Sequence, residues 1–340
     1  MIDQKPCYIL AIESSCDDTA AAVLKNDAVL SNVIANQTIH KAYGGVVPEL
    51  ASRAHQQNIV PVVDQALKKA GIDKKDLSAI AYTRGPGLLG SLLVGTSFAK
   101  SLSMALDIPL IEVNHLQGHL LSHFIQDDNP RPKFPFLGVT VSGGHTQIVR
   151  VDSHFSLEEL GTTLDDAIGE AFDKCGKVMG LGYPAGPQID RLAKEGNPAA
   201  FQFPIPKAPN LNVSYSGFKT AVINFLHKNQ QKNPSFIEEN LADLCASIQY
   251  TLIEIIFEKI KLAVDQTGLT EIAIGGGVAA NSGLRTKLKE AATQYKWMVH
   301  LPPFAYTTDN AAMIGIVGYF KFKEHLYGAL DQSATARLPL

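Results

Sequence analysis

The chain has 340 residues, of which 46% are hydrophobic, and a formal net charge of −3 at pH 7. These values describe a globular protein of about two domains that is long enough to bury a sizeable core. They exclude nucleic-acid binding driven by overall charge, so any contact with nucleic acid must come from a local basic patch or from a partner.

Neither the N-terminus nor the cysteines indicate secretion. Residues 1–6 are not followed by a long apolar segment, and no run approaches the roughly 18 apolar residues that a membrane span requires. The four cysteines are widely scattered without CxxC spacing, which is typical of reduced thiols. We therefore predict a soluble, cytoplasmic protein.

The first third of the chain predicts a strand meander followed by alternating helices and strands. Apolar runs at 8–12 and 20–24 flank a polar turn, 13–19, and a third run at 28–35 extends this hairpin. Pro48 begins a helix that runs to about residue 70, and Pro61 is expected to kink or divide it. The following elements are a strand at 78–83, a helix from the glycine segment 85–90 to about 105, a strand at 109–113 and a helix with two histidines.

The second half repeats this organisation after a polar, proline-rich linker at 126–133. Strands at 136–141 and 147–151 flank a Ser/Gly/Thr turn, as in the opening hairpin. A strand at 271–274, three glycines and a helix from about 279 repeat the unit at 79–105. This duplication predicts an α/β protein with two similar lobes whose polar turns face a cleft.

We expect the N-terminal lobe to comprise residues 1–128 plus about 302–340, and the C-terminal lobe to comprise 134–301. The last helix, from Asp309 to about 324, follows a strand at 298–301 and should pack on the first lobe.

Two glycine-rich turns are candidates for binding phosphate. The turn from Val141 through Ser142, Gly143 and Gly144 to His145 can bring several backbone N–H groups close to an anion, because glycine has no Cβ. The glycines at 275–277 precede a helix whose N-terminus adds partial positive charge. Each is also compatible with a simple tight turn, but together with the turn at 13–19 they favour a nucleotide in an interlobe cleft.

Four further polar or glycine positions follow in the second half. Asp173 lies in an acidic helix and is either a solvated residue or an acceptor for ribose hydroxyls. The rigid turn at 180–187 contains Gly186 and leads into a helix with Asp190. Asn281, at the start of the helix after the glycines, is either an ordinary exposed residue or reaches an adenine or ribose edge.

His115 and His119 are four residues apart, so in a helix both imidazoles lie on one face, where they can bind one metal ion. Solvated or capping histidines show the same spacing. Asp309 lies at a predicted helix start, where it is either an N-cap or the third ligand of a two-histidine, one-carboxylate site. Such a site leaves coordination positions open for substrate.

Ten short segments follow one another along nearly the whole chain. They are 13–19 (ESSCDDT), 43–49 (YGGVVPE), 85–88 (GPGL), 114–119 (NHLQGH), 141–146 (VSGGHT), 169–174 (GEAFDK), 183–187 (YPAGP), 216–220 (SGFKT), 275–281 (GGGVAAN) and 308–310 (TDN). This set resembles the TsaD family of tRNA threonylcarbamoyltransferases, once described as glycoproteases. His145 resembles the bacterial branch, whereas Asn114 and Thr140 depart from residues common in other members.

The resemblance implies a two-lobed actin-like, sugar-kinase-like (ASKHA) α/β fold with an interlobe nucleotide cleft. It implies transfer of a threonylcarbamoyl group from threonylcarbamoyl-AMP to N6 of the adenosine just 3′ of the anticodon, in tRNAs reading codons that begin with adenine. AMP is released, and ATP, ADP or AMP can occupy the same cleft. The implied partners are tRNA, a TsaB-like paralogue and a TsaE-like ATPase, with no membrane.

The resemblance also implies roles for individual residues. His115, His119 and Asp309 would hold one divalent metal ion, iron(II) or zinc. The residues that would bind the nucleotide-bearing substrate are Val141, Ser142, Gly143, Gly144, His145, Asp173, Gly186, Asp190 and Asn281.

The exocyclic amine of adenine is a poor nucleophile, so such an enzyme must activate the electrophile and orient the amine. Asp17, in the opening turn, is our candidate for proton removal. Candidate contacts for tRNA are Arg53, His55, Arg84, Lys207 and Lys219.

A metallopeptidase and a non-catalytic ATP-binding scaffold are the alternative functions. The helix of zinc proteases requires Glu directly after the first histidine, and Leu116 occupies that position here.

Overall fold

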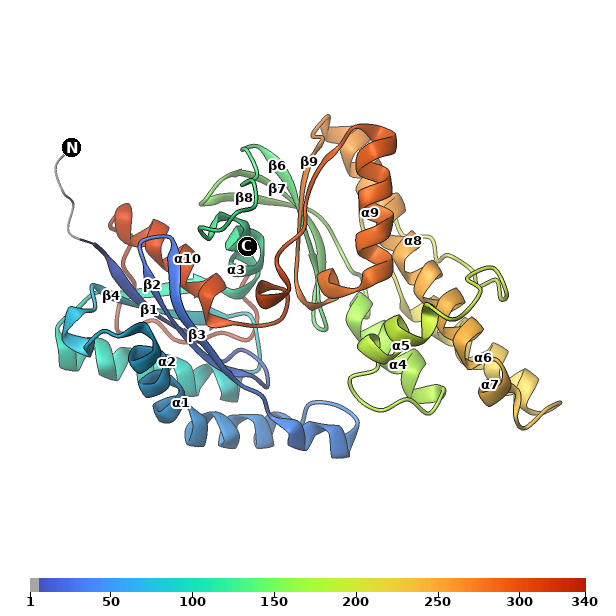
Figure 1. Ribbon diagram of the computed structural model, residues 1–340, viewed down its shortest axis with the longest axis horizontal. Helices are drawn as coiled ribbons and strands as arrows, with labels where there is room; N and C mark the ends of the chain where they lie inside the picture. Colours follow the sequence, from blue (N-terminus) through green and yellow to red (C-terminus); the bar gives the residue numbers. More distant parts are fainter. Residues whose placement is uncertain (1–5) are drawn as a thin grey trace. The chain divides into compact units, whose positions relative to one another are not determined.

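The computed structural model describes residues 6–340; the first five residues, which entered the argument against a targeting segment, lie outside this range. The chain divides into two compact units. Unit 1 comprises Met1–Arg131 and Asp309–Leu340, and unit 2 comprises Pro132–Thr308. Figure 1 shows the elements of both units coloured along the sequence.

Unit 1 contains a five-stranded sheet with helices packed against it. Its strands are β1 (Tyr8–Glu13), β2 (Thr19–Lys25), β3 (Ala28–Ala35), β4 (Ala79–Gly85) and β5 (Leu110–Asn114). Its helices are α1 (Pro48–Ala70), α2 (Leu89–Leu106), α3 (His115–Leu121) and α10 (Ala311–Lys323), with 3₁₀ turns at Thr38–Tyr43, Lys74–Asp76 and Ser122–Phe124. The strand order is β3-β2-β1-β4-β5, in which β1 pairs antiparallel with β2 and parallel with β4.

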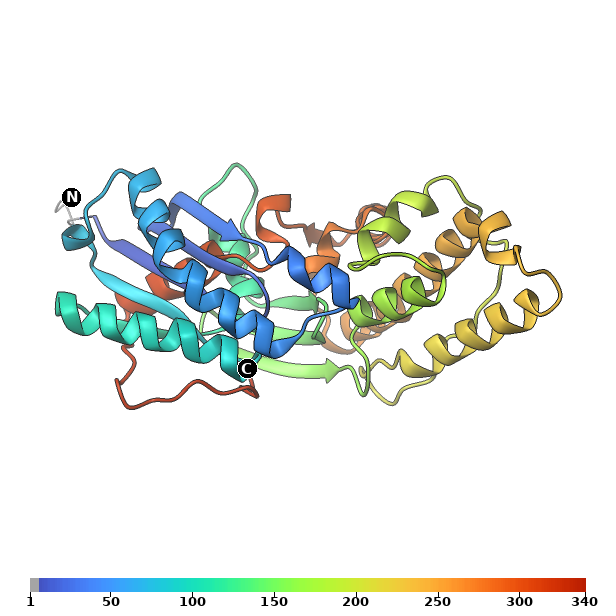
Figure 2. The same ribbon diagram turned by 90° about the horizontal axis from the view of Figure 1, so that it is seen from below.

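The central strand β1 is buried on both faces, which explains its uninterrupted apolar sequence. Leu10 and Ile12 belong to the core that includes Ile59 of α1, whereas Ile9 lies beside Gly318 of α10. Because successive side chains of a strand point to opposite faces, α1 and α10 cover opposite sides of the sheet, as Figures 1 and 2 also show.

One expectation for unit 1 needs correction, and the composition of α2 bears on another. Pro61 lies inside α1 but does not divide it, and α1 continues to Ala70, where Gly71 ends it in the left-handed conformation. The 18-residue helix α2 has a mean hydropathy of 1.3, so by length and composition it is apolar enough to cross a membrane. A single helix of this kind is weak evidence for a span, and α2 packs against α1 and β4.

Unit 2 repeats the sheet of unit 1 and adds a group of helices. Its strands are β6 (Phe136–Val141), β7 (Thr146–Ser153), β8 (Ser156–Thr162), β9 (Glu271–Gly275) and β10 (Met298–His300). Its helices are α4 (Ile168–Val178), α5 (Gly186–Ala193), α6 (Ser216–Gln230), α7 (Phe236–Glu239), α8 (Leu241–Thr267) and α9 (Ser282–Tyr295), with 3₁₀ turns at Gly277–Ala280 and Phe304–Tyr306.

The strand order of unit 2 is β10-β9-β6-β7-β8, with β6 antiparallel to β7 and parallel to β9. Read from the other edge, this is the order and the orientation found in unit 1. The duplicated hairpin and crossover predicted from the sequence are therefore confirmed. Strand β8 was not predicted, because only one of its seven residues is buried and they lack a clear apolar alternation.

Candidate metal centre and nucleotide-binding turns

The two histidines lie at the start of a short buried helix. Strand β5 ends at Asn114, whose Oδ1 accepts hydrogen bonds from the backbone N–H groups of Leu116 and Gln117 at 2.9 and 3.4 Å. This N-cap starts α3 directly at His115. His115 and His119 are both buried, and their ring centroids are 4.7 Å apart.

Asp309 is not the N-cap of the last helix. Asn310 has that role, because its Oδ1 accepts a hydrogen bond from the backbone N–H of Met313 at 3.1 Å. The Oδ1 atom of Asp309 lies 3.4 Å from Nε2 of His115 and 3.2 Å from Nε2 of His119. The ligand atoms of these three residues lie within 4.8 Å of one another.

The surroundings of His119 fit a metal ligand. Within the described chain, its buried Nδ1 and Nε2 atoms have no hydrogen-bond partner of acceptable geometry, although Nε2 is close to Asp309. Buried polar atoms without partners are uncommon in native proteins. A metal ion bound at Nε2 would satisfy one of them, so the donor set of two imidazoles and one carboxylate fits a divalent metal.

His115 and Asp309 each favour the charged form of the other. Burial disfavours the charged form of His115, but Asp309 and Glu13 outweigh it and hold the pKa of His115 well above its usual value. Burial likewise opposes the charged form of Asp309, yet the neighbouring His115 holds the pKa of this carboxyl well below its usual range. The anionic carboxylate that a metal requires is therefore favoured.

The opening turn contains two aspartates, of which Asp17 was the candidate proton acceptor. Both are partly exposed. Burial, reinforced by the charges of Asp17 and Asp309, raises the pKa of Asp18 to about 7. A carboxyl that titrates near neutral pH is suited to proton transfer, so Asp18 is a second candidate that the sequence reasoning missed.

His55 is not a surface cation, and its assignment as a candidate tRNA contact was wrong. It is fully buried in unit 1, where Nδ1 lies 2.8 Å from the hydroxyl of Thr19 and Nε2 lies 2.9 Å from the carbonyl of Cys16. Burial lowers the pKa of His55 and favours its neutral form. His55 therefore anchors the opening turn.

In unit 2, the turn between β6 and β7 is closed by Ser142 and His145. The backbone N–H of Ser142 donates to the carbonyl of His145 at 2.9 Å, and the N–H of His145 donates to the Ser142 hydroxyl at 3.0 Å. Gly143 and Gly144 are exposed, and a Cβ added to either would meet no atom within 4 Å. Their backbone is thus open to a ligand.

The start of α4 lies against this turn. The N–H of Gly169 donates to the carbonyl of Ser142 at 3.1 Å, and a Cβ on Gly169 would come within 2.8 Å of Gly143. The N-terminus of α4 therefore adds its partial positive charge beside the turn, an arrangement that favours an anion. Gly276 differs from Gly143, since its φ is +96° and a Cβ there would lie 2.4 Å from the carbonyl oxygen of Val141.

Asp173 and Asp190 both cap neighbouring helices of unit 2. Oδ1 of Asp173 accepts hydrogen bonds from the N–H groups of Ala185 and Gly186 at 2.7 and 3.4 Å, at the start of α5. Burial raises the pKa of Asp173 despite these bonds. Oδ1 of Asp190 accepts from the N–H and the hydroxyl of Ser282 at 3.1 and 2.7 Å, at the start of α9.

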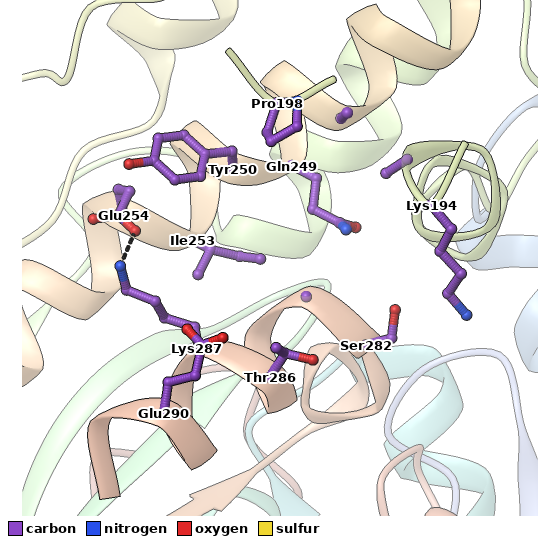
Figure 3. Close-up of a pocket in the computed structure, with 13 residues that line it drawn as sticks. Lys194, Pro198, Gln249, Tyr250, Ile253, Glu254, Ser282, Thr286, Lys287 and Glu290 are labelled. Atoms are coloured by element: carbon purple, nitrogen blue, oxygen red, sulfur yellow. Dashed lines mark ion pairs between the residues drawn. The ribbon is translucent and has the colours of Figure 1, made fainter. Parts of the chain in front are cut away.

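Asn281 is buried rather than exposed. Its Oδ1 accepts the N–H of Leu284 at 3.0 Å, and its Nδ2 donates to Oε1 of Gln249 on α8 at 2.7 Å. Gln249 also lines a cavity of about 450 Å³ between the end of α5, the middle of α8 and the start of α9 (Figure 3). No local sequence pattern marks Gln249, because it lies in a long helix that the sequence analysis did not assign.

Most side chains at the rim of this cavity are polar. Figure 3 shows Lys194, Ser282 and Thr286 on one side, and an ion pair between Lys287 and Glu254, 2.5 Å apart, on the other. The hydroxyl of Ser282 connects this rim to Asp190. Of the predicted substrate-binding residues, Asp173 is hydrogen-bonded to Gly186 at the start of α5. Asp190 and Asn281 are hydrogen-bonded to Ser282 and Gln249, which line the cavity.

Two of the predicted cationic contacts are held in ion pairs. Arg84 lies 3.0 Å from Glu112, and Lys219 lies 3.0 Å from Asp166; all four side chains are at most about one quarter exposed. Both cations therefore have structural partners. Lys207 is exposed, and Arg53 is an exposed residue of α1 that pairs with Glu49.

A family model described as TsaD, tRNA N6-adenosine threonylcarbamoyltransferase, matches residues 28–316 of the chain. The chain belongs to the TsaD family. A tRNA N6-adenosine threonylcarbamoyltransferase from Christiangramia forsetii is 62% identical to it over 338 residues, which cover 99% of both chains.

The TsaD assignment agrees with the fold. Component A of the (R)-2-hydroxyglutaryl-CoA dehydratase of Acidaminococcus fermentans superposes with a TM-score of 0.54, at 16% identity, covering 94% of this chain and 98% of that one. Full-length HypF superposes with a TM-score of 0.62, at 14% identity, covering 95% of this chain and 47% of that one. These similarities concern the fold alone and confirm the two-lobed ASKHA class.

As a TsaD enzyme, the chain is an acyltransferase that modifies tRNA by adding a threonylcarbamoyl group to N6 of adenosine. The predicted activity is thereby confirmed. Neither alternative, a metallopeptidase or a non-catalytic ATP-binding scaffold, is favoured.

Proposed function

We propose that this enzyme takes its acyl group from threonylcarbamoyl-AMP, modifies the adenosine just 3′ of the anticodon, and uses one divalent metal ion, iron(II) or zinc. The observation that supports the metal best is the approach of the ligand atoms of His115, His119 and Asp309 to within 4.8 Å. Among residues 6–340, the two buried ring nitrogens of His119 also find no hydrogen-bond partner. When bound there, a metal supplies a Lewis acid that stabilises negative charge on a substrate oxygen.

The phosphate of the donor is assigned to the turn from Val141 to His145. Support comes from the open backbone of Gly143 and Gly144 and from the adjacent N-terminus of α4. Backbone N–H groups and a helix N-terminus bind phosphate without needing a lysine or arginine side chain. This assignment agrees with the absence of a P-loop motif from the sequence.

The nucleoside of the donor is assigned to the helical part of unit 2. The cavity between α5, α8 and α9 has the volume that a nucleobase requires, and the amides of Gln249 and Asn281 lie beside it. Asp173 and Asp190 each use Oδ1 for capping, so the second oxygen of each carboxylate is assigned to ribose hydroxyls. ATP, ADP and AMP share this nucleoside and would bind in the same way.

Proton removal from the attacking amine is assigned to Asp17 in the opening turn. Its position supports this role, since the turn leads from β1, whose last residue Glu13 contacts His115. The raised pKa of Asp18 makes that residue the alternative acceptor. Single-turnover transfer by Asp17→Asn and by Asp18→Asn decides between the two residues. The transfer rate should no longer rise with pH in the variant that lacks the proton acceptor.

We assign a TsaB-like paralogue and a TsaE-like ATPase as partners, in the cytoplasm, where all four cysteines stay reduced as in this structure. Exposed apolar side chains on α1 and α2, among them Val60, Leu93 and Met104, support a protein partner on that side of unit 1. Leu93→Glu should abolish co-elution with the TsaB-like protein, whereas Met298→Glu, at an equally exposed methionine of unit 2, should not. Co-elution of both variants would contradict this surface.

Nucleoside mass spectrometry tests the whole proposal. Unmodified tRNA is incubated with the chain, threonylcarbamoyl-AMP and the two partners, and the digest is analysed for N6-threonylcarbamoyladenosine and its position. Product that forms from this donor, and that is lost after removal of metal and restored by iron(II) or zinc, is the expected result. Full product in metal-free protein would contradict the metal, and product only with another donor would contradict the adenylate.

A further inference from the structure

Glu13, at the end of β1, is a buried carboxylate outside the predicted set of metal ligands. Its side chain has no solvent exposure, yet Oε2 lies 3.0 Å from Nδ1 of His115. A carboxylate buried in this way requires donors around it. Two more are present: the hydroxyl of Thr83 donates to Oε2 at 2.6 Å, and the backbone N–H of Ser15 donates to Oε1 at 2.5 Å.

We propose that Glu13 is a positioning residue for the metal centre, which holds His115 with its proton on Nδ1 and its Nε2 lone pair directed toward the metal position. This inference rests on the proposed metal site. An ionised carboxylate only accepts hydrogen bonds, so the contact at Nδ1 needs an N–H on that nitrogen. In the neutral ring the other nitrogen, Nε2, is then unprotonated, and it is this atom that faces Asp309 at 3.4 Å.

The ionised state of Glu13 follows from its partners. The Thr83 hydroxyl and the Ser15 N–H both act as donors to it, and His115 completes the set. The carboxylate therefore increases the basicity of the imidazole and fixes its ring plane, as outer carboxylates do for metal-bound histidines in general.

The two ligand histidines differ in this respect. In the described structure Nδ1 of His119 is buried without a hydrogen-bond partner, so no carboxylate orients this ring from its Nδ1 side. Helix α3 packs closely on α10 at this point, since a Cβ on Gly118 would lie 3.1 Å from Ile314. Glu13 thus orients His115 but not His119. Replacing Glu13 should weaken metal binding without moving Asp309.

The test is the affinity of purified, metal-stripped protein for Zn²⁺, measured at pH 8 by competition with a chelator. Glu13→Gln keeps the size of the side chain but removes its charge, and it should weaken Zn²⁺ binding by about 10- to 100-fold. Two matched controls separate positioning from general electrostatics. Ser15→Ala removes the weaker neighbour of Nδ1, at 3.2 Å, and Asp18→Asn removes a nearby charge that does not contact a ligand. Both should change the affinity by about threefold or less.

The outcomes are distinct. Equal Zn²⁺ binding by wild type and His119→Ala would overturn the metal site itself. If His119→Ala loses Zn²⁺ binding but Glu13→Gln keeps wild-type Zn²⁺ affinity, only the role of Glu13 is overturned. The same conclusion follows if Glu13→Gln and Asp18→Asn lose equal Zn²⁺ affinity.

A second measurement does not depend on the folding of any variant. In the Zn²⁺-loaded wild-type protein, long-range ¹H–¹⁵N correlation should show His115 with a slowly exchanging proton on Nδ1 and Nε2 unprotonated. A ring coordinated through Nδ1, or one with no protected Nδ1 proton, would contradict the proposal.

Discussion

Nδ2 of Asn281 donates a hydrogen bond to Oε1 of Gln249, 2.7 Å away, and both side chains are buried. Replacing Gln249 by leucine keeps the volume but leaves the Asn281 amide without its acceptor, which costs about 1–3 kcal/mol. Gln249→Leu should lower the affinity for AMP about tenfold in calorimetric titration. Glu290→Gln, at the same cavity, is the control and should bind like wild type. Equal affinities in both would mean that the cavity does not hold the nucleobase.

A second prediction concerns the loss of bound metal when one of the three proposed ligands is replaced. His115→Ala, His119→Ala and Asp309→Ala each remove one of three donors, so each should reduce the metal bound to purified protein. Elemental analysis per mole of protein measures this. His325→Ala, at an exposed histidine of unit 1, should keep wild-type content. Full metal occupancy in all three ligand variants would rule out the site.

Gly143 and Gly276 should respond differently to substitution by valine. Gly143 has open space around it, so Gly143→Val should fold normally and weaken AMP binding by blocking the approach of the phosphate. Gly276→Val should instead destabilise the protein by more than about 2 kcal/mol, because its φ is +96° and Val141 leaves no room. Thermal unfolding and calorimetric titration of both variants check this. Wild-type AMP binding by Gly143→Val would show that the turn is only structural.

Because of Asp18, the free energy of unfolding of the metal-stripped protein should depend on pH. Its pKa is about 7 in the folded protein and about 3.9 when unfolded, so folding takes up a proton between these values. The contribution of the Asp18 carboxyl to the free energy of unfolding is fully present below about pH 4 and is lost as the pH rises through about 7. Asp18→Asn should therefore be more stable than wild type by on the order of 3 kcal/mol near pH 8, with a much smaller difference near pH 5. Denaturant unfolding at both pH values measures this, and a difference independent of pH would contradict it.

Arg84 allows a charge-swap test of tRNA binding. Arg84→Glu breaks the ion pair with Glu112, so a loss of transfer could reflect structure alone. The double variant Arg84→Glu/Glu112→Arg restores the pair with reversed polarity. If residue 84 contacts tRNA, the double variant should keep nucleotide affinity but remain deficient in single-turnover transfer, with a weaker salt dependence. Restored transfer would assign tRNA docking to other residues or to the partners.

The local properties of this chain were predictable from its sequence. The strand at 28–35 and the helix from Pro48 to Ala70 have the predicted bounds, because apolar periodicity and terminal residues are local signals. The spacing of His115 and His119 predicted a shared helix face in the same way. The similarity of the two halves was also visible, since both copies keep the order of strand, turn and glycine segment.

The contacts that give these residues their roles depend on tertiary structure. Glu13 and His115 are 102 residues apart in sequence, and Asn281 and Gln249 are 32 apart, so no local period relates them. The approach of Asp309 to His115 and His119 depends on how α10 packs against α3. The burial of His55 depends on how α1 packs against the opening turn. Sequence periodicity determines which side of a helix or strand is apolar, whereas only the packed chain determines which polar groups lose water and must find each other.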